Sequence, residues 1–235
     1  MHNLIIIGGR LAQDPKFING HMNGSVRIYS KNADNETENH YFNFSLPVSE
    51  ERAAKLKEIM VKDTVVQVTG SLNEREWKSK DGSAGSVFEV NATNIVKTDG
   101  LNSALGSIRG TLAREPERRG KIVTTALRFP AAYDKNAEKQ RQIFLECVFF
   151  GTIGDNMEKY FHKGDAVILN GNLTTNSYIN KEGKKITTPR LLVNTFADKI
   201  VLRNNDSAEA APAAPADSVA DYAVMDDEEG CPFPF

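Results

Sequence analysis

The sequence predicts an all-β chain made of two copies of one barrel domain, followed by an acidic tail. The first observation is a repeat, because KDTVVQVTGSL at 62–72 returns as KGDAVILNGNL at 163–173, an offset of 101 residues. The same offset relates GRLAQDP at 9–15 to GTLAREP at 110–116. Second, apolar and polar residues alternate in short runs, which is the period of β-strands. Third, residues 204–224 are rich in Ala, Pro and Asp, a composition that cannot bury enough surface to fold.

The first copy shows five strand patterns and one helix pattern. In the third strand, Phe42 and Phe44 share the core face, which leaves Tyr41 and Asn43 facing outward. Ser49 is expected to cap the helix, whose inner stripe is Leu56, Ile59 and Met60. The strands are expected at 3–9, 25–30, 41–46, 62–72 and 87–96, with the helix at 49–60.

The second copy repeats this order. Cys147 and its row face the core of the third strand, which turns Phe144 and Phe150 outward. A five-stranded unit with a helix between its third and fourth strands has the order of an OB-fold barrel. The sequence therefore predicts two tandem OB-fold barrels, at 1–99 and 100–203, and a disordered acidic tail at 204–235. The strands are expected at 105–112, 121–129, 143–150, 163–173 and 191–202, with a helix at 153–161.

The strand that follows each repeated glycine leads into a hairpin that carries an aromatic residue. In the first copy Arg75 and Trp77 point the same way, with Lys78 and Lys80 beside them. In the second copy Tyr178 takes the place of Trp77. Exposed aromatics among cations suit the stacking of bases beside a phosphate backbone.

The charges are segregated along the chain. The formal net charge is −2, but the residues from 204 onward hold eight acids and no Lys or Arg, so the rest of the chain carries +6. A basic body with an acidic tail indicates an anionic partner and a separate partner for the tail. No apolar run approaches the roughly 20 residues that span a membrane. Two cysteines, Cys147 and Cys231, favour a reducing, cytoplasmic compartment.

No catalytic or metal-ligating constellation is apparent. The four histidines are scattered without metal-ligand spacing, and no Ser/His/Asp, Cys/His or paired-carboxylate set can be assembled. The sequence thus predicts a binding protein without a cofactor or metal, and not an enzyme.

Several motifs resemble the bacterial single-stranded-DNA-binding proteins, and the likeness covers both copies and the tail. In the second copy these motifs are GTLAREP at 110–116, FFG at 149–151, YFHKG at 160–164 and GNL at 171–173. The tail resembles the family as well, since the acids at 226–229 precede a doubled Pro-Phe, with Cys231 as a departure. Glu146 and Asn43 also depart, because the family tends to have a basic residue at those places.

The resemblance implies which residues contact DNA. Family members stack bases on aromatics, and the matching residues are Tyr41 and Trp77 in the first copy and Tyr133, Phe144, Phe150 and Tyr178 in the second. Tyr29 and Phe17 are assigned to packing. Other basic residues are either phosphate contacts or solubilising charges: Arg10, Arg27, Lys121, Arg128, Lys184 and Lys185.

The function that the resemblance implies is sequence-independent coating of single-stranded DNA in replication, recombination and repair, with a nucleoid-associated location. The tip formed by Asp226, Asp227, Glu228, Glu229, Pro234 and Phe235 would recruit partner enzymes. Family members usually assemble four OB domains, which implies a homodimer here. Two alternatives remain at this point: an OB-fold RNA-binding or translation factor, and an OB-scaffold protein-interaction module.

Overall fold

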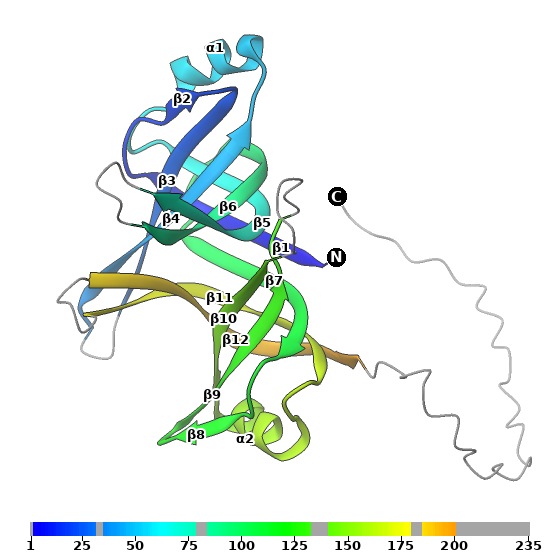
Figure 1. Cartoon of the computed structure of the whole chain (residues 1–235). Helices are drawn as coiled ribbons and strands as arrows, with labels where there is room; N and C mark the ends of the chain where they lie inside the picture. The colour runs from blue at the N-terminus through cyan, green and yellow to red at the C-terminus, as the bar shows by residue number, and fades with distance from the viewer. Residues whose placement is uncertain (1, 32–34, 79–83, 133–140, 180–184, 201–235) are drawn as a thin grey trace, which may run out of the picture. The chain divides into compact units, whose positions relative to one another are not determined.

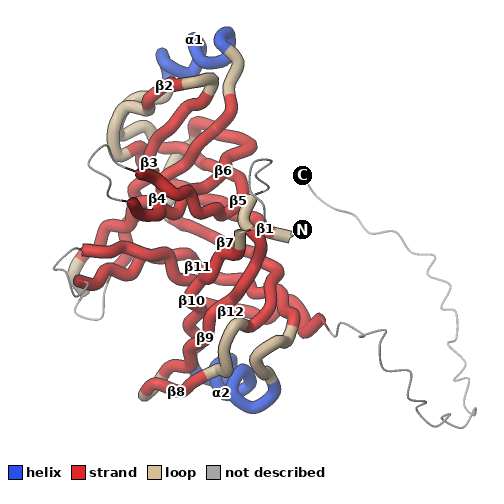
Figure 2. The backbone as a smooth tube through the Cα atoms, viewed as in Figure 1, coloured by secondary structure: helices blue, strands red, loops and turns tan. Residues whose placement is uncertain are grey.

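The computed structural model describes residues 2–31, 35–78, 84–132, 141–179 and 185–200. These residues form strands almost throughout, with two short helices (Figure 2). The two barrels belong to one compact unit. None of the helices in the described part of the chain is long and apolar enough to cross a membrane. The all-β, two-barrel prediction is confirmed.

The first barrel contains one more strand than the sequence predicts. Its elements are β1 (Asn3–Leu11), β2 (Lys16–Ile18), β3 (His21–Lys31), β4 (Thr37–Pro47), α1 (Glu50–Ile59), β5 (Val65–Lys78) and β6 (Ala84–Lys97). The additional strand, β2, pairs with β3 through a two-residue turn at Asn19 and Gly20, both with positive φ. Asn-Gly is the preferred sequence for such a hairpin turn, so the signal was present in the sequence.

The second barrel repeats the first, including the additional strand. Its elements are β7 (Ser103–Leu112), β8 (Glu117–Arg119), β9 (Ile122–Pro130), β10 (Gln142–Phe150), α2 (Gly151–Tyr160), β11 (Ala166–Ile179) and β12 (Lys185–Ile200). Strand β8 pairs with β9 across a turn at Gly120 and Lys121.

Each set of strands closes on itself. In the first barrel the pairs β1–β5, β5–β6, β6–β4, β4–β3 and β3–β1 complete a ring, and β7, β11, β12, β10 and β9 do the same in the second. The core is lined by the inward rows that the alternation predicts, including Phe42 and Phe44 in one barrel and Cys147 and Phe149 in the other. Burial raises the pKa of the Cys147 thiol to about 12, so this thiol is not a nucleophile near neutral pH.

The end of α1 differs from the predicted inner stripe. Ser49 caps the helix as expected, since its hydroxyl accepts a hydrogen bond from the Arg52 amide at 3.3 Å. Leu56 and Met60 are buried, but Ile59 is exposed. The helix ends at Ile59, and Met60 leaves it with a non-helical φ and ψ. The chain therefore turns Met60 toward the core and leaves Ile59 in solvent.

The two barrels meet through an antiparallel pairing of their first strands (Figure 1). Ile5 of β1 lies opposite Gly106 of β7, and the repeat offset of 101 makes these two positions equivalent. Asn3 opposite Ile108 and Ile7 opposite Ala104 are likewise related to each other by that offset. The joint consequently has the pseudo-two-fold symmetry of the repeat, as if two identical domains had paired.

The linker between the barrels is attached to the first one. The side-chain amide of Asn102 makes the two hydrogen bonds that a neighbouring strand would make to Tyr29. Its oxygen accepts from the Tyr29 backbone amide at 2.8 Å, and its nitrogen donates to the Tyr29 carbonyl at 2.7 Å. Leu101 packs where a Cβ on Gly8 would otherwise lie. These contacts hold the linker against β1 and β3.

Candidate nucleic-acid interface

An arginine lies beside an exposed aromatic ring on the outer surface of each barrel. Arg27 of β3 pairs in register with Tyr41 of β4, and Arg128 of β9 pairs with Phe144 of β10. Tyr41 is 52% exposed and Phe144 is 56% exposed, so neither ring belongs to the core. Cross-strand neighbours on one face are about 5 Å apart, which places cation and ring next to each other. The same pair thus recurs at structurally equivalent places.

Asp63 distinguishes the first barrel's pair from the second. Its carboxylate lies 3.3 Å from Arg27 Nη2, and its carbonyl accepts a hydrogen bond from Arg10 Nη1 at 3.0 Å. Asp63 has a left-handed backbone, with φ 64, and the repeat places Gly164 at the equivalent position, also with positive φ. No acid therefore stands at that place beside Arg128. Arg27 is partly compensated by a negative charge.

A second cation and aromatic ring lie at the far end of the β9–β10 ladder. Phe150 is half exposed and pairs with Ile122, which follows the exposed Lys121. The two rings, Phe144 beside Arg128 and Phe150 near Lys121, are six positions apart along β10, which is a span of about 20 Å. Between them Arg190 of β12 binds Glu146 of β10 at 2.9 Å. Glu146, which stands where the family tends to have a basic residue, is thus paired with a cation of its own barrel.

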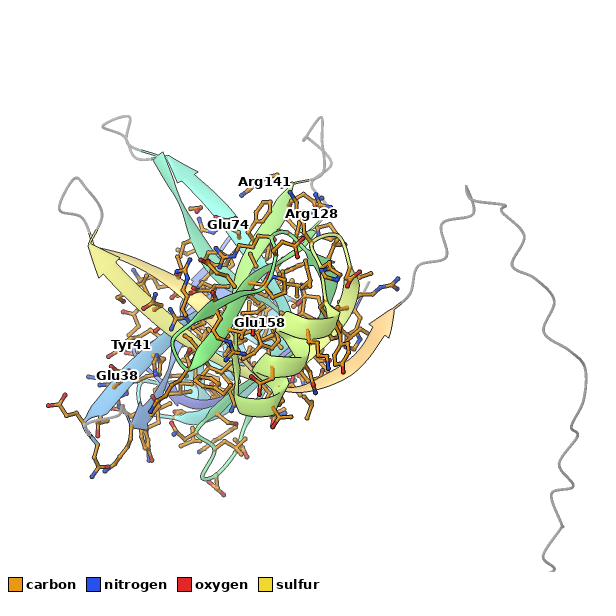
Figure 3. The ribbon with its side chains drawn as sticks, turned by 90° about the horizontal axis from the view of Figure 1, so that it is seen from below. Glu38, Tyr41, Glu74, Arg128, Arg141 and Glu158 are labelled. Atoms are coloured by element: carbon orange, nitrogen blue, oxygen red, sulfur yellow. The ribbon has the colours of Figure 1, made fainter. Side chains whose placement is uncertain are left out.

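The long hairpins that follow the repeated glycines each contact the other barrel. Asn73 of β5 accepts a hydrogen bond from the Ala132 amide at 3.1 Å, and Glu74 lies 3.7 Å from Arg141. Arg128, Arg141 and Glu74 are labelled on that side in Figure 3. In the opposite direction, Thr175 of β11 contacts His40 of β4. Arg75, beyond Glu74 on the same hairpin, binds Glu89 of β6 at 3.1 Å.

The side chains of several predicted site residues lie outside the described part of the structure. Trp77, Lys78, Tyr178 and Lys185 lie on strands β5, β11 and β12, but only their backbone is described. The loop and tail residues fall outside the described residues altogether: Lys80, Tyr133, Lys184, Asp226, Asp227, Glu228, Glu229, Pro234 and Phe235.

Tyr29 is an exposed aromatic that the sequence analysis assigned wrongly to packing. Its side chain is 57% exposed, two residues along β3 from Arg27, and therefore on the same face. The alternation of β3 contained this signal, because Tyr29 shares the parity of Arg27 and not that of the buried Ile28. Phe17, in contrast, does pack against the core, with the Lys57 ammonium 5.2 Å from its ring centre.

Comparison with known proteins places this double barrel among relatives. Residues 106–198 match the model of the single-strand binding protein family. This match lies within the second barrel, so that part of the chain is similar to the family. Over 89 residues it is 30% identical to the single-stranded DNA-binding protein of Clostridium perfringens, covering 37% of this chain and 59% of that protein. The chain thus spans less than two thirds of the length of that relative.

Two further relatives are similar along more of the chain. The single-stranded DNA-binding protein of Deinococcus radiodurans is 25% identical over 187 residues, which cover 69% of this chain and 62% of the relative. The crystal structure of the single-stranded DNA-binding protein from Thermus aquaticus superposes with a TM-score of 0.58 at 18% identity, covering 92% of this chain and 96% of that one. The latter likeness shows that the two share a fold.

Proposed function

We propose that this protein binds single-stranded DNA with little regard to sequence and protects it during replication, recombination and repair. The observation that carries the proposal is the pair of arginine and exposed ring, Arg27 with Tyr41 and Arg128 with Phe144, at the same place in both barrels. The match of residues 106–198 to the single-strand binding protein family supports the same conclusion. In this view the protein acts by binding and carries out no catalysis.

The chemistry of the paired residues matches the two parts of a nucleotide. The guanidinium groups bind phosphates and release counterions from the DNA, and the rings stack on bases, each stack contributing about 1–3 kcal/mol. Neither interaction reads a base edge, so the binding tolerates any sequence. Trp77, Tyr178 and the lysines of the hairpins extend this surface in the proposal, as do Tyr133, Lys121 and Phe150.

We further propose that the acidic tip at 226–235 recruits replication, recombination and repair enzymes. Its acids would steer it to a basic surface, and the ring of Phe235 would fill an apolar pocket there. The same acids repel phosphate, so the tip is not part of the DNA site. The division into domains at 1–99, 100–203 and 204–235, and a cytoplasmic, nucleoid-associated location, belong to the same proposal.

A homodimer completes the proposal, with four barrels in two chains. Leu4, Ile6 and Leu105 line an outward-facing hollow of about 320 Å³ over the β1–β7 joint. Leu4 and Leu105 are equivalent by the repeat, and both are more than 40% exposed. An exposed apolar patch on a pseudo-symmetric sheet suits a second copy of the same surface.

The test is a titration with single-stranded oligo-dT followed by the fluorescence of the single tryptophan, Trp77. Bases that stack on Trp77 are expected to quench its emission, and affinity is expected to fall steeply as salt rises. Binding that does not respond to salt would overturn the electrostatic part of the proposal. An absence of any binding to oligo-dT would overturn it entirely.

A further inference from the structure

A cleft of about 320 Å³ lies between the first barrel and the hairpin of the second. One wall comes from β4 and β6, with Tyr41 and Phe88, and the other comes from β11 and β12, with Ser177 and Thr187. Figure 1 shows the β11–β12 hairpin, in yellow, running past the end of β4. Figure 3 labels Tyr41 at this place, far from Arg128. The volume is at the lower end of the range of about 300–1,000 Å³ for small-molecule sites.

His40 holds the two walls of the cleft together. The imidazole is 4% exposed and lies between Ser30 Oγ, at 2.8 Å, and Thr175 Oγ1, at 2.9 Å. The Thr175 amide also donates to His40 Nδ1 at 3.2 Å. Because Nδ1 accepts this bond, the imidazole is neutral and its Nε2–H donates to Ser30. The hairpin is therefore fixed against β4, and the cleft is a built feature of the unit.

The floor of the cleft carries hydrogen-bonding groups that do not occur at the equivalent place in the second barrel. Asn43 of β4 and Glu89 of β6 are register partners, and both line the cleft. The equivalent register pair in the second barrel is Glu146 and Arg190, which neutralise each other in an ion pair at 2.9 Å. In the second barrel the two register partners thus pair with each other, whereas in the first barrel Asn43 keeps its amide and Glu89 pairs with Arg75 of β5.

Glu89 is an unusual group for a DNA-binding surface, since its negative charge opposes phosphate. Its side chain is only 10% exposed, and Arg75 Nε lies 3.1 Å from its Oε2. The Arg75 side chain is 58% exposed, so the positive member of the pair faces solvent, whereas the nearly buried Glu89 lines the cleft. A phosphate approaching from outside meets the guanidinium first, and the carboxylate remains available for a neutral hydrogen-bond donor.

We propose that this cleft binds one unpaired nucleobase and favours a base with an exocyclic amino group, cytosine above all. The proposal rests on the single-stranded DNA binding proposed above and names a subsite within it. Tyr41 and Phe88 supply apolar contact to the base face, and Glu89 accepts a hydrogen bond from the amino group. Thymine presents a carbonyl oxygen where cytosine presents its amino group, and two acceptors facing each other leave both unpaired. Because only one bound base per chain occupies this cleft, DNA strands of different mixed sequence are still expected to bind with nearly equal affinity.

The experiment is a competition between oligo-dC and oligo-dT of the same length, on the full chain. Homopolymers are used because the base in the cleft is then known. The quantity measured is the ratio of the dC affinity to the dT affinity, for wild type, Glu89→Gln and Glu146→Gln. Each substitution also frees an arginine from its ion pair, Arg75 in Glu89→Gln and Arg190 in Glu146→Gln. The freed positive charge strengthens the binding of both oligomers equally, so it does not change the ratio of the two affinities.

The Glu89→Gln variant is expected to lower the dC-to-dT ratio about fivefold or more, since its amide can donate to the thymine carbonyl. Glu146→Gln, the matched control in the second barrel, is expected to leave the ratio as in wild type. An unchanged ratio in Glu89→Gln, or an equal change in both variants, would overturn the cleft proposal. If Glu89→Gln does not fold, Asn43→Ala takes its place, because Asn43 is the register partner of Glu89 in the cleft and its amide oxygen is the second acceptor for the amino group. A lowered ratio is expected, and an unchanged one would contradict the proposal. Loss of all binding to both oligomers in wild type would instead refute the proposed function.

Discussion

We expect single residues on the outer face of the barrels to contribute to binding without contributing to stability. Phe144 is 56% exposed, whereas Phe149, on the opposite face of the same strand, is completely buried. Phe144→Ala is expected to weaken single-stranded DNA binding by about 1–3 kcal/mol with little change in melting temperature. Phe149→Ala is the control, and should lower the unfolding free energy by about 3–5 kcal/mol. Oligo-dT titration and thermal unfolding measure the two effects, and a Phe144→Ala protein that binds normally would contradict the stacking role.

Asp63 provides a second residue-scale prediction. Asp63→Gly copies Gly164 of the second barrel, and glycine is well suited to the left-handed backbone there. Removing the carboxylate frees Arg27 for phosphate, while the backbone carbonyl that binds Arg10 remains. Single-stranded DNA affinity should therefore rise, and its dependence on salt should steepen by up to about one phosphate contact. Titrations of both proteins at several salt concentrations measure the slope. An unchanged slope would mean that Arg27 does not contact phosphate.

At the scale of the elements, the repeat and the alternation predicted most of the strands, because each buried row has the period of a strand. What could not be predicted came from long-range packing. Nothing local to His40 indicates that Thr175, 135 residues away, would bury it, and nothing local to Asn43 and Glu89 makes them neighbours. The cleft therefore had no sequence signal. Tyr29 and the Asn19–Gly20 turn, in contrast, had local signals that were read incorrectly or missed.

The contact between β4 and β11 should be sensitive to pH. Burial lowers the pKa of the His40 imidazole below its usual 6.5, an effect that Glu38 partly opposes. Below about pH 6.5 the unfolded chain takes up a proton that the folded imidazole still excludes, so stability falls as pH falls through this window. It stops falling below the folded pKa, where both states carry the proton. Among the described groups, Ser30 and Thr175 contact the ring and Glu38 is the charged neighbour.

The measurement is the melting temperature at about pH 7.5 and about pH 5.5. Wild type is expected to lose more stability between these values than His40→Gln does. His21→Gln, which replaces an exposed histidine, is the matched control and should behave like wild type. Equal losses in wild type and His40→Gln would show that His40 does not titrate in this contact.

The repeated glycines also belong to the element scale. Strand β11 shifts register at Gly171, where a Cβ would collide with the Leu192 backbone carbonyl, and Gly70 has the same relation to Asn91 in the first barrel. Gly171→Ala should lower the unfolding free energy by about 1–3 kcal/mol, because the backbones of β11 and β12 must move apart. Thermal unfolding tests this, with Asn172→Ala at the exposed neighbouring position expected to be nearly neutral. A fully stable Gly171→Ala protein would contradict the close approach.

For the whole molecule, the pseudo-symmetric joint between β1 and β7 makes one chain equivalent to a pair of domains. Light scattering is expected to give about twice the chain mass of 25.9 kDa if two chains associate through the Leu4 and Leu105 surface. Leu4→Glu with Leu105→Glu should shift the protein to one chain, since two charges would then be buried in the interface. A monomeric wild type would contradict the homodimer.

The proposed role of the tail belongs to the same scale, because we expect the tail to act through partners and not through DNA. Phe235→Ala is expected to abolish capture of replication and repair enzymes while leaving the binding of oligo-dT unchanged. Capture by the variant that equals that of wild type would show that the ring is not the docking group.

The most direct test of the central claim, that the two barrels form a surface for single-stranded DNA, is a competition among oligo-dT, oligo-rU and duplex DNA at low and high salt. The account predicts that oligo-dT displaces the other two, and that its affinity falls steeply with salt because phosphates release counterions. Duplex DNA should compete poorly, since its paired bases cannot stack on Tyr41 and Phe144. Preference for oligo-rU would indicate an RNA-binding function, and equal competition by duplex DNA would contradict the account.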